Sequence, residues 1–353
     1  MVLLHIANIE TAVVGGVNVA VPKMVTAQKE FATVGILNLV GEPIASVPTF
    51  TINDFWKGAI PTPFDKPDLV IFHEVYRPAF LKLARYFSKS NIPYLVIPHG
   101  CLTKTAQRKK FLKKWIANLL LFRPFLKNAR SIQYLSAREQ EQSIVSDPYV
   151  ILPNGIPLPE EEKTASVSEA VRFLYIGRLE WKIKGFDLLF GALHLKKELL
   201  RQTNTTFSIY GPKEDPARKA LQKMIKRYDL SDMVNLLGEL WGEEKKSAFL
   251  SFDYFIQTSR SEGMPMGLLE ALGHGLPVIV TQGTGFAQTV NEEHCGFGCK
   301  TTKEDIALAI EKAIRQKGDY PTLSKNARAL IEANFEEKAV AKKTVTAYQT
   351  LLQ

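Results

Sequence analysis

The sequence predicts an α/β protein built from two doubly wound parallel-sheet domains that face a cleft. Apolar runs of strand length alternate with helical stretches along the chain, and this alternation is typical of parallel βαβ units. The 353 residues are enough for two separate cores. A content of 46% apolar and 23% charged residues excludes disordered and collagen-like classes.

The expected elements form two series. Residues 1–8 and 93–97 are expected to be buried strands of the first series, with a strand at 68–72 and a helix at 78–87 between them. The second series has strands at 172–176, 207–210, 234–237, 254–257 and 278–280. Ligands of such sheets bind where the carboxyl ends of the strands face a crevice.

The domain boundaries follow from composition. Residues 1–156 form the expected N-terminal domain and residues 170–334 the C-terminal domain. Residues 157–169 are rich in Pro, Glu, Ser and Lys and are expected to be a linker. Residues 335–353 are expected to contain a terminal helix with Val340, Val345, Tyr348 and Leu352 on one face.

The N-terminus carries no basic leader and no signal-type cleavage site, so we expect a cytoplasmic protein. Three cysteines are too few for a disulfide framework, and the two closest, Cys295 and Cys299, lack further ligands for a metal site. No apolar run approaches the roughly 20 residues of a membrane span, so any membrane contact would be peripheral.

A basic segment at residues 104–130 accounts for the whole net charge of +9. It has no acidic residue and contains Lys104, Arg108, Lys109, Lys110, Lys113, Lys114, Arg123, Lys127 and Arg130. Its apolar residues at helical spacing are Phe111, Leu112, Trp115, Ile116, Leu119 and Leu120. A basic amphipathic helix over 104–127 would suit the anionic inner face of the cell membrane. Alternatively, the apolar stripe packs into the domain core. Nucleic-acid binding lacks a supporting motif.

The segment from Ser259 to Leu272 carries two carboxylates, Glu262 and Glu270, eight positions apart across a loop-to-helix junction. Pro265 fits the first turn of a helix, where its missing N–H costs nothing. A helix N-terminus also favours anions such as a diphosphate. The segment therefore suits a sugar nucleotide. In the alternative interpretation, these acids only complement the helix dipole and solvate the helix surface.

This segment resembles the E-x7-E motif of the family 4 retaining glycosyltransferases. The following residues 273–281 are similar to the turn and strand that come after the motif in that family, and Gly177 to Leu189 is similar to its G-R-L…K-G pattern. Pro153-Asn154-Gly155-Ile156 matches its P-N-G-I element. The resemblance covers nearly the whole chain. It implies the GT-B fold, with two Rossmann-like domains and a C-terminal helix that crosses back to the first.

The resemblance also implies roles for individual residues. Glu262 would contact the donor sugar and Glu270 the ribose, while Arg178 and Lys184 would hold the diphosphate and stabilise its departure. His99, the third expected catalytic residue, would reach the donor sugar from a strand end. The expected donor-binding residues are Glu262, Gly263, Met264, Pro265, Met266, Gly267, Glu270, Gly15, Gly16, Gly211, Gly238, Glu239 and Leu240. His73 and Glu74, at a strand end, are expected on the acceptor side.

Together these features predict a retaining, metal-independent hexosyltransferase of cell-surface polysaccharide synthesis. It would use a nucleotide-diphosphate sugar as co-substrate, with a UDP-sugar favoured, no cofactor, and a glycan or lipid-linked acceptor. Two alternatives remain: a nucleotide-sugar epimerase of similar fold, which gives no reason for the two glutamates, and a non-catalytic basic module that binds membrane surfaces.

Overall fold

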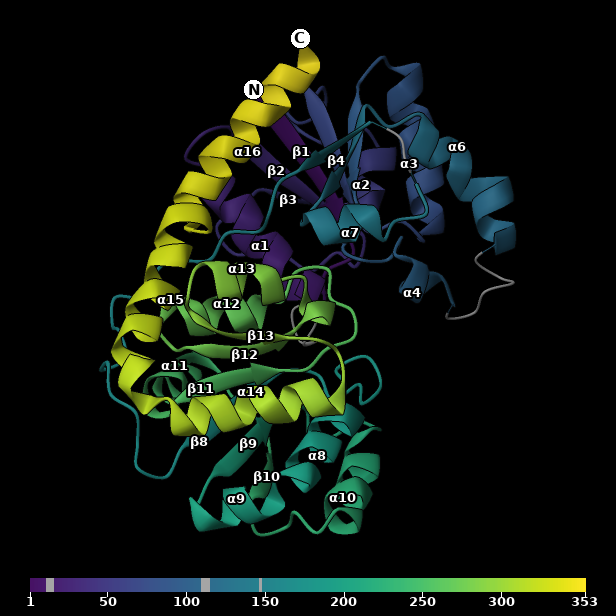
Figure 1. The fold of residues 1–353 in the computed structure, drawn as a ribbon. Coiled ribbons are helices and arrows are strands. Elements are labelled where there is room, and N and C mark those ends of the chain that lie inside the picture. Colours follow the sequence, from purple (N-terminus) through teal and green to yellow (C-terminus); the bar gives the residue numbers. More distant parts are fainter. Residues whose placement is uncertain (11–15, 109–114, 146–147) are drawn as a thin grey trace. The chain divides into compact units, whose positions relative to one another are not determined.

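The structure is a computed structural model that describes residues 1–10, 16–108, 115–145 and 148–353. The chain divides into two compact units (Figure 1). Unit 1 comprises Met1–Pro157 together with Glu336–Gln353, and unit 2 comprises Leu158–Phe335.

Unit 1 contains a seven-stranded parallel sheet of order β3-β2-β1-β4-β5-β6-β7. The strands are β1 Val2–Ala7, β2 Thr33–Asn38, β3 Thr49–Thr51, β4 Leu69–His73, β5 Tyr94–Ile97, β6 Ser131–Tyr134 and β7 Tyr149–Ile151. The helices are α1 Gly16–Gln28, α2 Ile52–Trp56, α3 Pro78–Lys89, α4 Lys104–Arg108, the π-helix η1 Asn118–Phe122, α6 Arg123–Lys127, α7 Ala137–Glu141 and α16 Glu337–Leu352. The strand order reverses between β1 and β4, which marks a switch point where ligands bind in such sheets.

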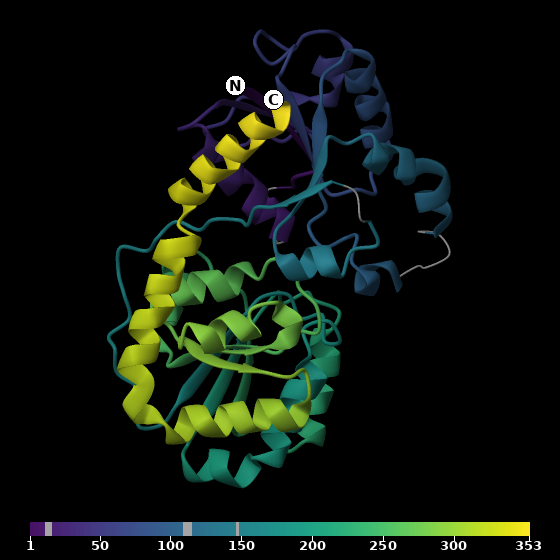
Figure 2. The same ribbon diagram turned by 45° about the horizontal axis from the view of Figure 1, so that its top comes forward.

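The C-terminal helix α16 belongs to unit 1 and packs against α1 (Figures 1 and 2). Val340, Val345 and Tyr348 of its expected apolar face are buried, and Tyr348 is completely so. The prediction that the terminal helix returns to the first domain is therefore confirmed.

Unit 2 contains a six-stranded parallel sheet of order β10-β9-β8-β11-β12-β13. The strands are β8 Arg172–Ile176, β9 Thr206–Tyr210, β10 Val234–Leu237, β11 Tyr254–Gln257, β12 Val278–Thr281 and β13 Gly296–Cys299. The helices are α8 Phe186–Leu195, α9 Lys197–Gln202, α10 Arg218–Arg227, α11 Gly242–Ser251, α12 Met266–Gly273, α13 Ala287–Glu292, α14 Lys303–Arg315 and α15 Tyr320–Asn334, with short 3₁₀ turns η2 Gln282–Thr284 and η3 Lys317–Asp319. Here the order reverses between β8 and β11.

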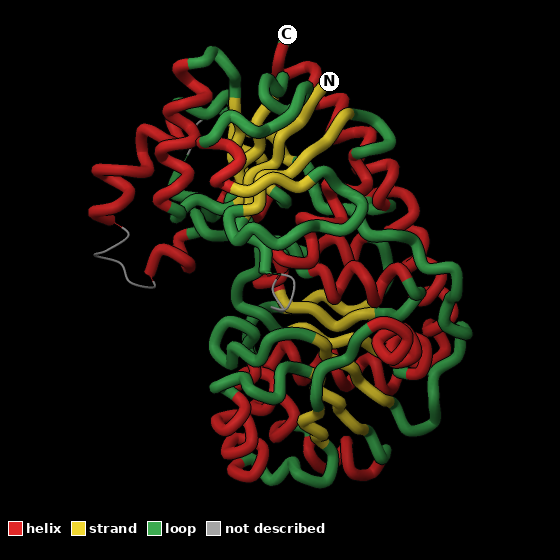
Figure 3. Tube along the Cα trace, turned by 180° about the vertical axis from the view of Figure 1, so that it is seen from behind, coloured by secondary structure: helices red, strands yellow, loops and turns green. Residues whose placement is uncertain are grey.

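Helices cover the sheet of each unit (Figure 3). The buried strands are rich in branched and aromatic residues, as strands covered on both faces require. Stacked Phe173 and Phe207, for example, join β8 and β9 in the core of unit 2 with ring centroids 4.6 Å apart. The predicted α/β class and its two doubly wound sheets are confirmed.

Residues 158–169, within the stretch expected to be a linker, belong to unit 2. The Lys163 amide donates to the His274 carbonyl, and the Lys163 ammonium lies 3.9 Å from the buried Asp253 carboxylate. Ser168 donates two hydrogen bonds to the same carboxylate. These contacts hold the segment against the domain instead of leaving it solvated.

Candidate functional site

Two loops of unit 2 meet at the switch point of its sheet. Residues 177–185 follow β8, and residues 258–265 follow the neighbouring strand β11. Arg260 joins them, because its guanidinium donates to both carboxylate oxygens of Asp187 at 2.7 Å and its amide donates to the Ile183 carbonyl. A bidentate pair of this kind fixes orientation as well as distance. These contacts therefore fix the two loops to each other.

Gly185 allows the two backbones to approach each other. Its φ of 70° lies in the left-handed region, and an added Cβ would come 2.0 Å from the carbonyl oxygen of Thr258. The Thr258 hydroxyl in turn donates to the carbonyls of Lys184 and Gly185. Only glycine satisfies both the dihedral angle and the space.

Lys184 and Glu262 form an ion pair across these loops. The Lys184 Nζ atom lies 2.7 Å from the Glu262 Oε1 atom, and their side chains are 12% and 11% exposed. Burial alone would raise the pKa of Glu262, but the Lys184 charge and three hydrogen bonds hold it below its ordinary value. Glu262 is therefore a carboxylate at neutral pH.

The three donors to Glu262 converge on one oxygen. Gln257 Nε2, Ser259 Oγ and Lys184 Nζ all donate to Oε1. Oε2 accepts none of these three bonds, so the carboxylate is fixed by one oxygen and can present the other to a ligand hydroxyl.

Arg178 lies at the start of the first loop; its side chain is 52% exposed, and its guanidinium lies 4.0 Å from the Glu180 carboxylate. Its carbonyl accepts from the Tyr175 hydroxyl at 2.8 Å, and the next amide, that of Leu179, donates to Asp215. The backbone is thus held while the cation reaches solvent. A planar guanidinium in this position can bind two phosphate oxygens at once.

Glu270 lies in α12, where its carboxylate is 2.5 Å from the Lys245 ammonium of α11. The helix begins at Met266, and Pro265 occupies the N-cap position. The expectation that Pro265 stands within the first turn is wrong by one residue, because its ψ of 83° is not helical. Its carbonyl still accepts the first helical bonds, from Leu268 and Leu269.

Four of the remaining residues expected at the donor site lie at this helix start. Gly263, Met264 and Met266 lie in or next to the loop that carries Glu262. Gly267 lies in the first turn of α12, where an added Cβ would come within 3.3 Å of the Ile176 carbonyl.

The carboxyl ends of β8, β9 and β10 are joined by glycines. The Gly211 amide donates to the Gly238 carbonyl, and an added Cβ on Gly211 would come 2.6 Å from the Gly177 carbonyl. Lys213 lies over Gly238, whose added Cβ would be 2.8 Å from the Lys213 Cε atom. The glycines thus let these strand ends lie close together, with the Lys213 side chain against Gly238.

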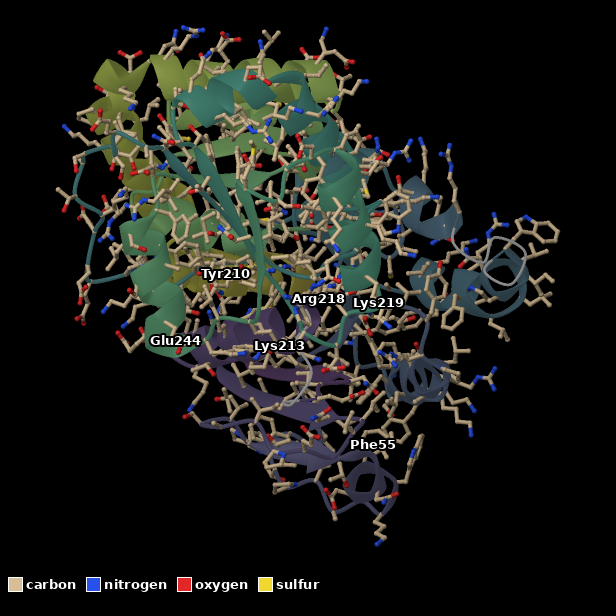
Figure 4. The ribbon with its side chains drawn as sticks, turned by 90° about the horizontal axis from the view of Figure 1, so that it is seen from below. Phe55, Tyr210, Lys213, Arg218, Lys219 and Glu244 are labelled. Atoms are coloured by element: carbon tan, nitrogen blue, oxygen red, sulfur yellow. The ribbon has the colours of Figure 1, made fainter. Side chains whose placement is uncertain are left out.

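Beyond Gly238, Glu239 is exposed and accepts from the Trp241 indole, and Leu240 is half-buried. Tyr210 ends β9 and Arg218 begins α10, where its guanidinium donates to the carbonyls of Leu236 and Leu237 (Figure 4).

In unit 1, the structure places His73 inside the core and His99 at the end of β5. His73 is completely buried, and its imidazole contacts those of His5 and His99. His73 therefore faces other histidines instead of solvent. Glu74 has a φ of 74° and forms an ion pair with Arg77 at 2.9 Å.

Gly16 begins α1, and an added Cβ there would meet nothing within 4 Å. Gly15, the other glycine expected to contact the donor, lies outside the described residues, as do Lys109, Lys110, Lys113 and Lys114 of the basic segment.

Four apolar residues of the expected stripe are exposed: Trp115, Ile116, Leu119 and Leu120. Asn118 anchors this segment through hydrogen bonds with Tyr76 and Gln107, and the Phe122 side chain is buried. For the described part of the stripe, packing into the core is therefore wrong. No described helix is long and apolar enough to cross a membrane.

The sequence interpretation missed several residues of the site. Lys245 and Arg260 pair with Glu270 and Asp187, while Gln257 and Ser259 donate to Glu262. Gln257 and Ser259 could have been found, because they lie within five residues of Glu262 at the end of β11. Lys245 could not, since 25 residues separate it from Glu270.

Burial raises the pKa of Cys295 and of Cys299 to about 12, and their thiols donate to separate backbone carbonyls. Among the residues that the structure describes, no three His, Cys, Asp or Glu side chains gather as a metal-ion cluster.

The second unit is similar to proteins of a known family. Residues 159–330 match the model of the Glycosyl transferases group 1 family. A component of human phosphatidylinositol N-acetylglucosaminyltransferase is 28% identical over 183 residues, which cover 51% of this chain and 36% of that protein. A putative colanic acid biosynthesis glycosyltransferase of Salmonella typhimurium is 26% identical over 145 residues, covering 38% of this chain and 36% of that protein. The chain thus spans about a third of the length of these relatives.

The fold is shared over the whole chain with solved structures. The Anabaena protein HepE in complex with UDP and glucose has a TM-score of 0.73 at 18% identity, and the match covers 99% of each chain. Residues 159–330 are thus similar to the glycosyl transferases group 1 family, and the two units have the GT-B architecture.

Proposed function

We propose that this protein is a retaining glycosyltransferase that moves a hexose from a nucleotide-diphosphate sugar to a glycan or lipid-linked acceptor. The observation that carries the proposal is the buried Lys184–Glu262 pair at the switch point of unit 2, with the half-exposed Arg178 on the same loop as Lys184. A carboxylate that can accept from a hydroxyl and two cations on one loop match a ligand with sugar hydroxyls next to phosphates.

In this proposal, Glu262 binds the donor sugar. Its Oε1 atom is occupied by three protein donors, so Oε2 is the atom that accepts from a sugar hydroxyl. Its lowered pKa keeps it ionised, which strengthens that hydrogen bond. Glu270, 2.5 Å from Lys245, would accept from the ribose hydroxyls.

The chemical step breaks the bond between the anomeric carbon and the diphosphate oxygen, and the diphosphate keeps the electron pair. The acceptor oxygen then bonds to that carbon on the same face, and its proton passes to the departing phosphate. Arg178 and Lys184 stabilise the charge that develops on the diphosphate, which is the larger part of such catalysis. This chemistry assigns no step to a metal ion.

UDP is the nucleotide we favour, and cell-surface polysaccharide synthesis is the role. HepE is described in complex with UDP and glucose, and the Salmonella relative as a putative colanic acid biosynthesis enzyme.

The exposed apolar residues Trp115, Ile116, Leu119 and Leu120 extend the proposal to the acceptor. Arg123 and Lys127 follow them in the next helix, so apolar side chains and cations lie together, as in helices that bind anionic bilayers. Peripheral contact with the inner face of the cell membrane would bring the site to a lipid-linked acceptor.

Sedimentation with vesicles tests the membrane contact. Wild-type protein is expected to sediment with vesicles containing an anionic phospholipid, and Leu119→Asp together with Leu120→Asp is expected to abolish this. Leu308→Asp, at an exposed leucine of α14, is the matched control. Equal sedimentation of all three proteins would overturn the contact.

The enzymatic proposal is tested by screening UDP-, GDP- and ADP-sugars for protection against heating and for release of nucleotide diphosphate with acceptor. Arg178→Ala is expected to weaken nucleotide binding, since it loses the exposed cation. Glu262→Gln is expected to reduce transfer about 100-fold while nucleotide binding persists. Absence of protection by every nucleotide sugar, or unchanged binding in Arg178→Ala, would contradict the proposal.

A further inference from the structure

Three histidines of unit 1 form a hydrogen-bonded row beside the switch point of its sheet. His5 Nδ1 lies 2.8 Å from His73 Nε2, and His73 Nδ1 lies 3.0 Å from His99 Nε2. The inner end of the row is Gln28, whose Oε1 atom lies 3.0 Å from His5 Nε2. His5, His73 and Gln28 are completely buried, whereas His99 is partly exposed.

The sheet register builds this row. His5 on β1 lies opposite Ile71 of β4, two residues before His73. His73 in turn lies opposite Ile97 of β5, two residues before His99. Because alternate residues of a strand point to the same face of the sheet, the imidazoles of His5 and His73 lie on one face. His73 lies two residues nearer the carboxyl edge of the sheet than His5. His99, just past the end of β5, continues that diagonal with a φ of 50°.

The buried Glu139 carboxylate holds the loop that carries His99. The Glu139 carboxylate accepts from the amide of Gly100 through one oxygen and from that of Leu135 through the other. Glu139 is 1% exposed, and this clamp keeps His99 in its left-handed backbone conformation.

Bond directions along the row are set from its inner end. Gln133 Nε2 donates to the carbonyl of Leu152, which can only accept. The Oε1 atom of Gln133 therefore accepts from the Tyr348 hydroxyl of α16. The Tyr348 hydroxyl proton is used in that bond, so only the lone pairs of its oxygen can face Gln28. The Gln28 amide nitrogen makes no hydrogen bond of normal geometry among the described residues, but its side chain lies close enough to Tyr348 to affect the pKa of that hydroxyl.

This orientation of Gln28 leaves its Oε1 atom facing His5, and an amide oxygen only accepts. His5 must therefore carry its proton on Nε2. Each neutral imidazole has one donor and one acceptor nitrogen, so His73 must donate to His5 and His99 must donate to His73. Burial favours the neutral forms, since it lowers the pKa of His5 to about 4 and lowers those of His73 and His99 as well.

We propose that Gln28, His5 and His73 are positioning residues that fix His99 as the Nε2–H tautomer, so that its Nδ1 atom meets the transferred sugar as a hydrogen-bond acceptor. Within the described part of the chain, His99 Nδ1 makes no hydrogen bond. This inference rests on the proposed function, because it needs a donor sugar that reaches His99.

A fixed acceptor selects the chemical class of the sugar. A hydroxyl or an amide N–H can donate to Nδ1, whereas the carboxylate of a hexuronic acid has only lone pairs to offer and is repelled. The row therefore favours neutral hexoses over hexuronic acids at the position that His99 contacts.

Nitrogen NMR of histidine-labelled protein without ligand tests the row at pH 7.5. Resonances are assigned by comparison with single histidine variants, and His194→Gln is the control at a histidine outside the row. We expect His5, His73 and His99 each to be protonated on Nε2 alone. A His99 protonated on Nδ1, or averaged between two tautomers, would overturn the proposal.

Variants of Gln28 test how the row acts on ligands. Gln28→Met removes the acceptor that sets the direction, so His99 is expected to sample both tautomers. Gln28→Glu keeps an acceptor at His5 and is expected to retain the wild-type tautomer.

The binding probes are UDP, UDP-glucose and UDP-glucuronic acid, measured by calorimetry. In Gln28→Met, affinity for UDP-glucuronic acid is expected to rise about tenfold, since His99 can then donate one hydrogen bond to the carboxylate. Affinities for UDP and UDP-glucose should change less than about threefold, because UDP lacks the sugar and a hydroxyl can donate or accept. A purely structural role would weaken all three probes together, and that result would overturn the proposal.

The outcomes separate this inference from the proposed function. If the tautomers are as expected but no nucleotide sugar binds, the proposed function fails and the role of the row toward a sugar fails with it, while its direction stands. If UDP-sugars bind and the hexuronic preference is unchanged in Gln28→Met, only the positioning role fails.

Discussion

The Glu262 carboxylate is charged inside unit 2 because a lysine from a different loop lies next to it. Its pKa is held below the ordinary value by Lys184 despite burial. The lowered pKa stabilises the fold at pH values above the ordinary carboxylate pKa, and this contribution is lost as the pH falls through the folded value. Without the lysine, only the hydrogen bonds from Ser259 and Gln257 oppose the burial that raises the pKa of Glu262.

Lys184→Met is therefore expected to destabilise the protein by about 3 to 5 kcal/mol at pH 7, because it leaves a buried carboxylate without its counter-ion. Urea unfolding followed by tryptophan fluorescence measures the change. Lys246→Met is the matched control, since its ion pairs with Glu161 and Glu243 are exposed. A loss in Lys184→Met no larger than in the control would mean that the pair adds nothing to stability.

The buried histidines are also expected to destabilise the fold in acid, because burial keeps them neutral in the folded state, whereas Glu262 is kept charged. The pKa of His5 falls from 6.5 to about 4 in the folded state, so the unfolded chain binds more protons between these values. Stability then decreases as the pH is lowered through this window, by roughly 2 kcal/mol for one such imidazole at pH 5.

Thermal unfolding of His5→Gln measures this effect. The decrease in Tm between pH 7 and pH 5 is expected to be smaller in the variant than in the wild type, even if its Tm at pH 7 is lower. Equal pH dependence of the two proteins would show that His5 does not titrate in the way that its burial implies.

At the scale of elements, the site of unit 2 depends on two loops held together by backbone contacts. The bidentate Arg260–Asp187 pair and the bonds of the Thr258 hydroxyl join the turn after β8 to the turn after β11. Lys184 and Glu262 are brought together because these turns are joined, so loss of the junction should remove both.

Gly185→Ala tests the junction. A φ of 70° and a Cβ only 2.0 Å from the Thr258 carbonyl leave no room for the added methyl group. We expect a loss of about 3 kcal/mol or more in the free energy of unfolding, with loss of nucleotide-sugar protection. Gly318→Ala is the control, since its added Cβ would meet nothing within 4 Å. A Gly185→Ala protein that behaves like Gly318→Ala would contradict this account.

Sequence patterns predicted these elements well and their junction poorly. The strands 172–176 and 254–257 appear with the expected bounds, because runs of branched and aromatic residues bounded by turns carry a strong local signal. The pairing of Asp187 with Arg260 spans 73 residues, and no local pattern records it.

At the scale of the whole molecule, the C-terminal helix α16 completes unit 1 after the chain has built unit 2. Tyr348 is completely buried, and Arg130 donates to the carbonyl of Leu351 across 221 positions. The fold of unit 1 therefore depends on residues far away in the sequence.

Removal of residues 336–353 is expected to destabilise unit 1 selectively, because it exposes the face of α1 that α16 covers. Hydrogen exchange followed by mass spectrometry should show lost protection in α1 and β6, with β8 and β12 of unit 2 unchanged. Uniform loss of protection in both units would show that the units do not unfold separately.

The sequence alone determined the α/β class, the two doubly wound sheets and the motif segments, since strand and helix periodicities and turn residues are local properties. The return of the terminal helix to the first domain was expected only from the family resemblance. The tertiary structure alone decided which distant side chains pair with one another. Lys184 with Glu262, Lys245 with Glu270, and the row from Gln28 to His99 join residues that are distant in sequence. Strand order and register create these contacts, because parallel strands that follow one another by crossovers bring their carboxyl ends to one edge.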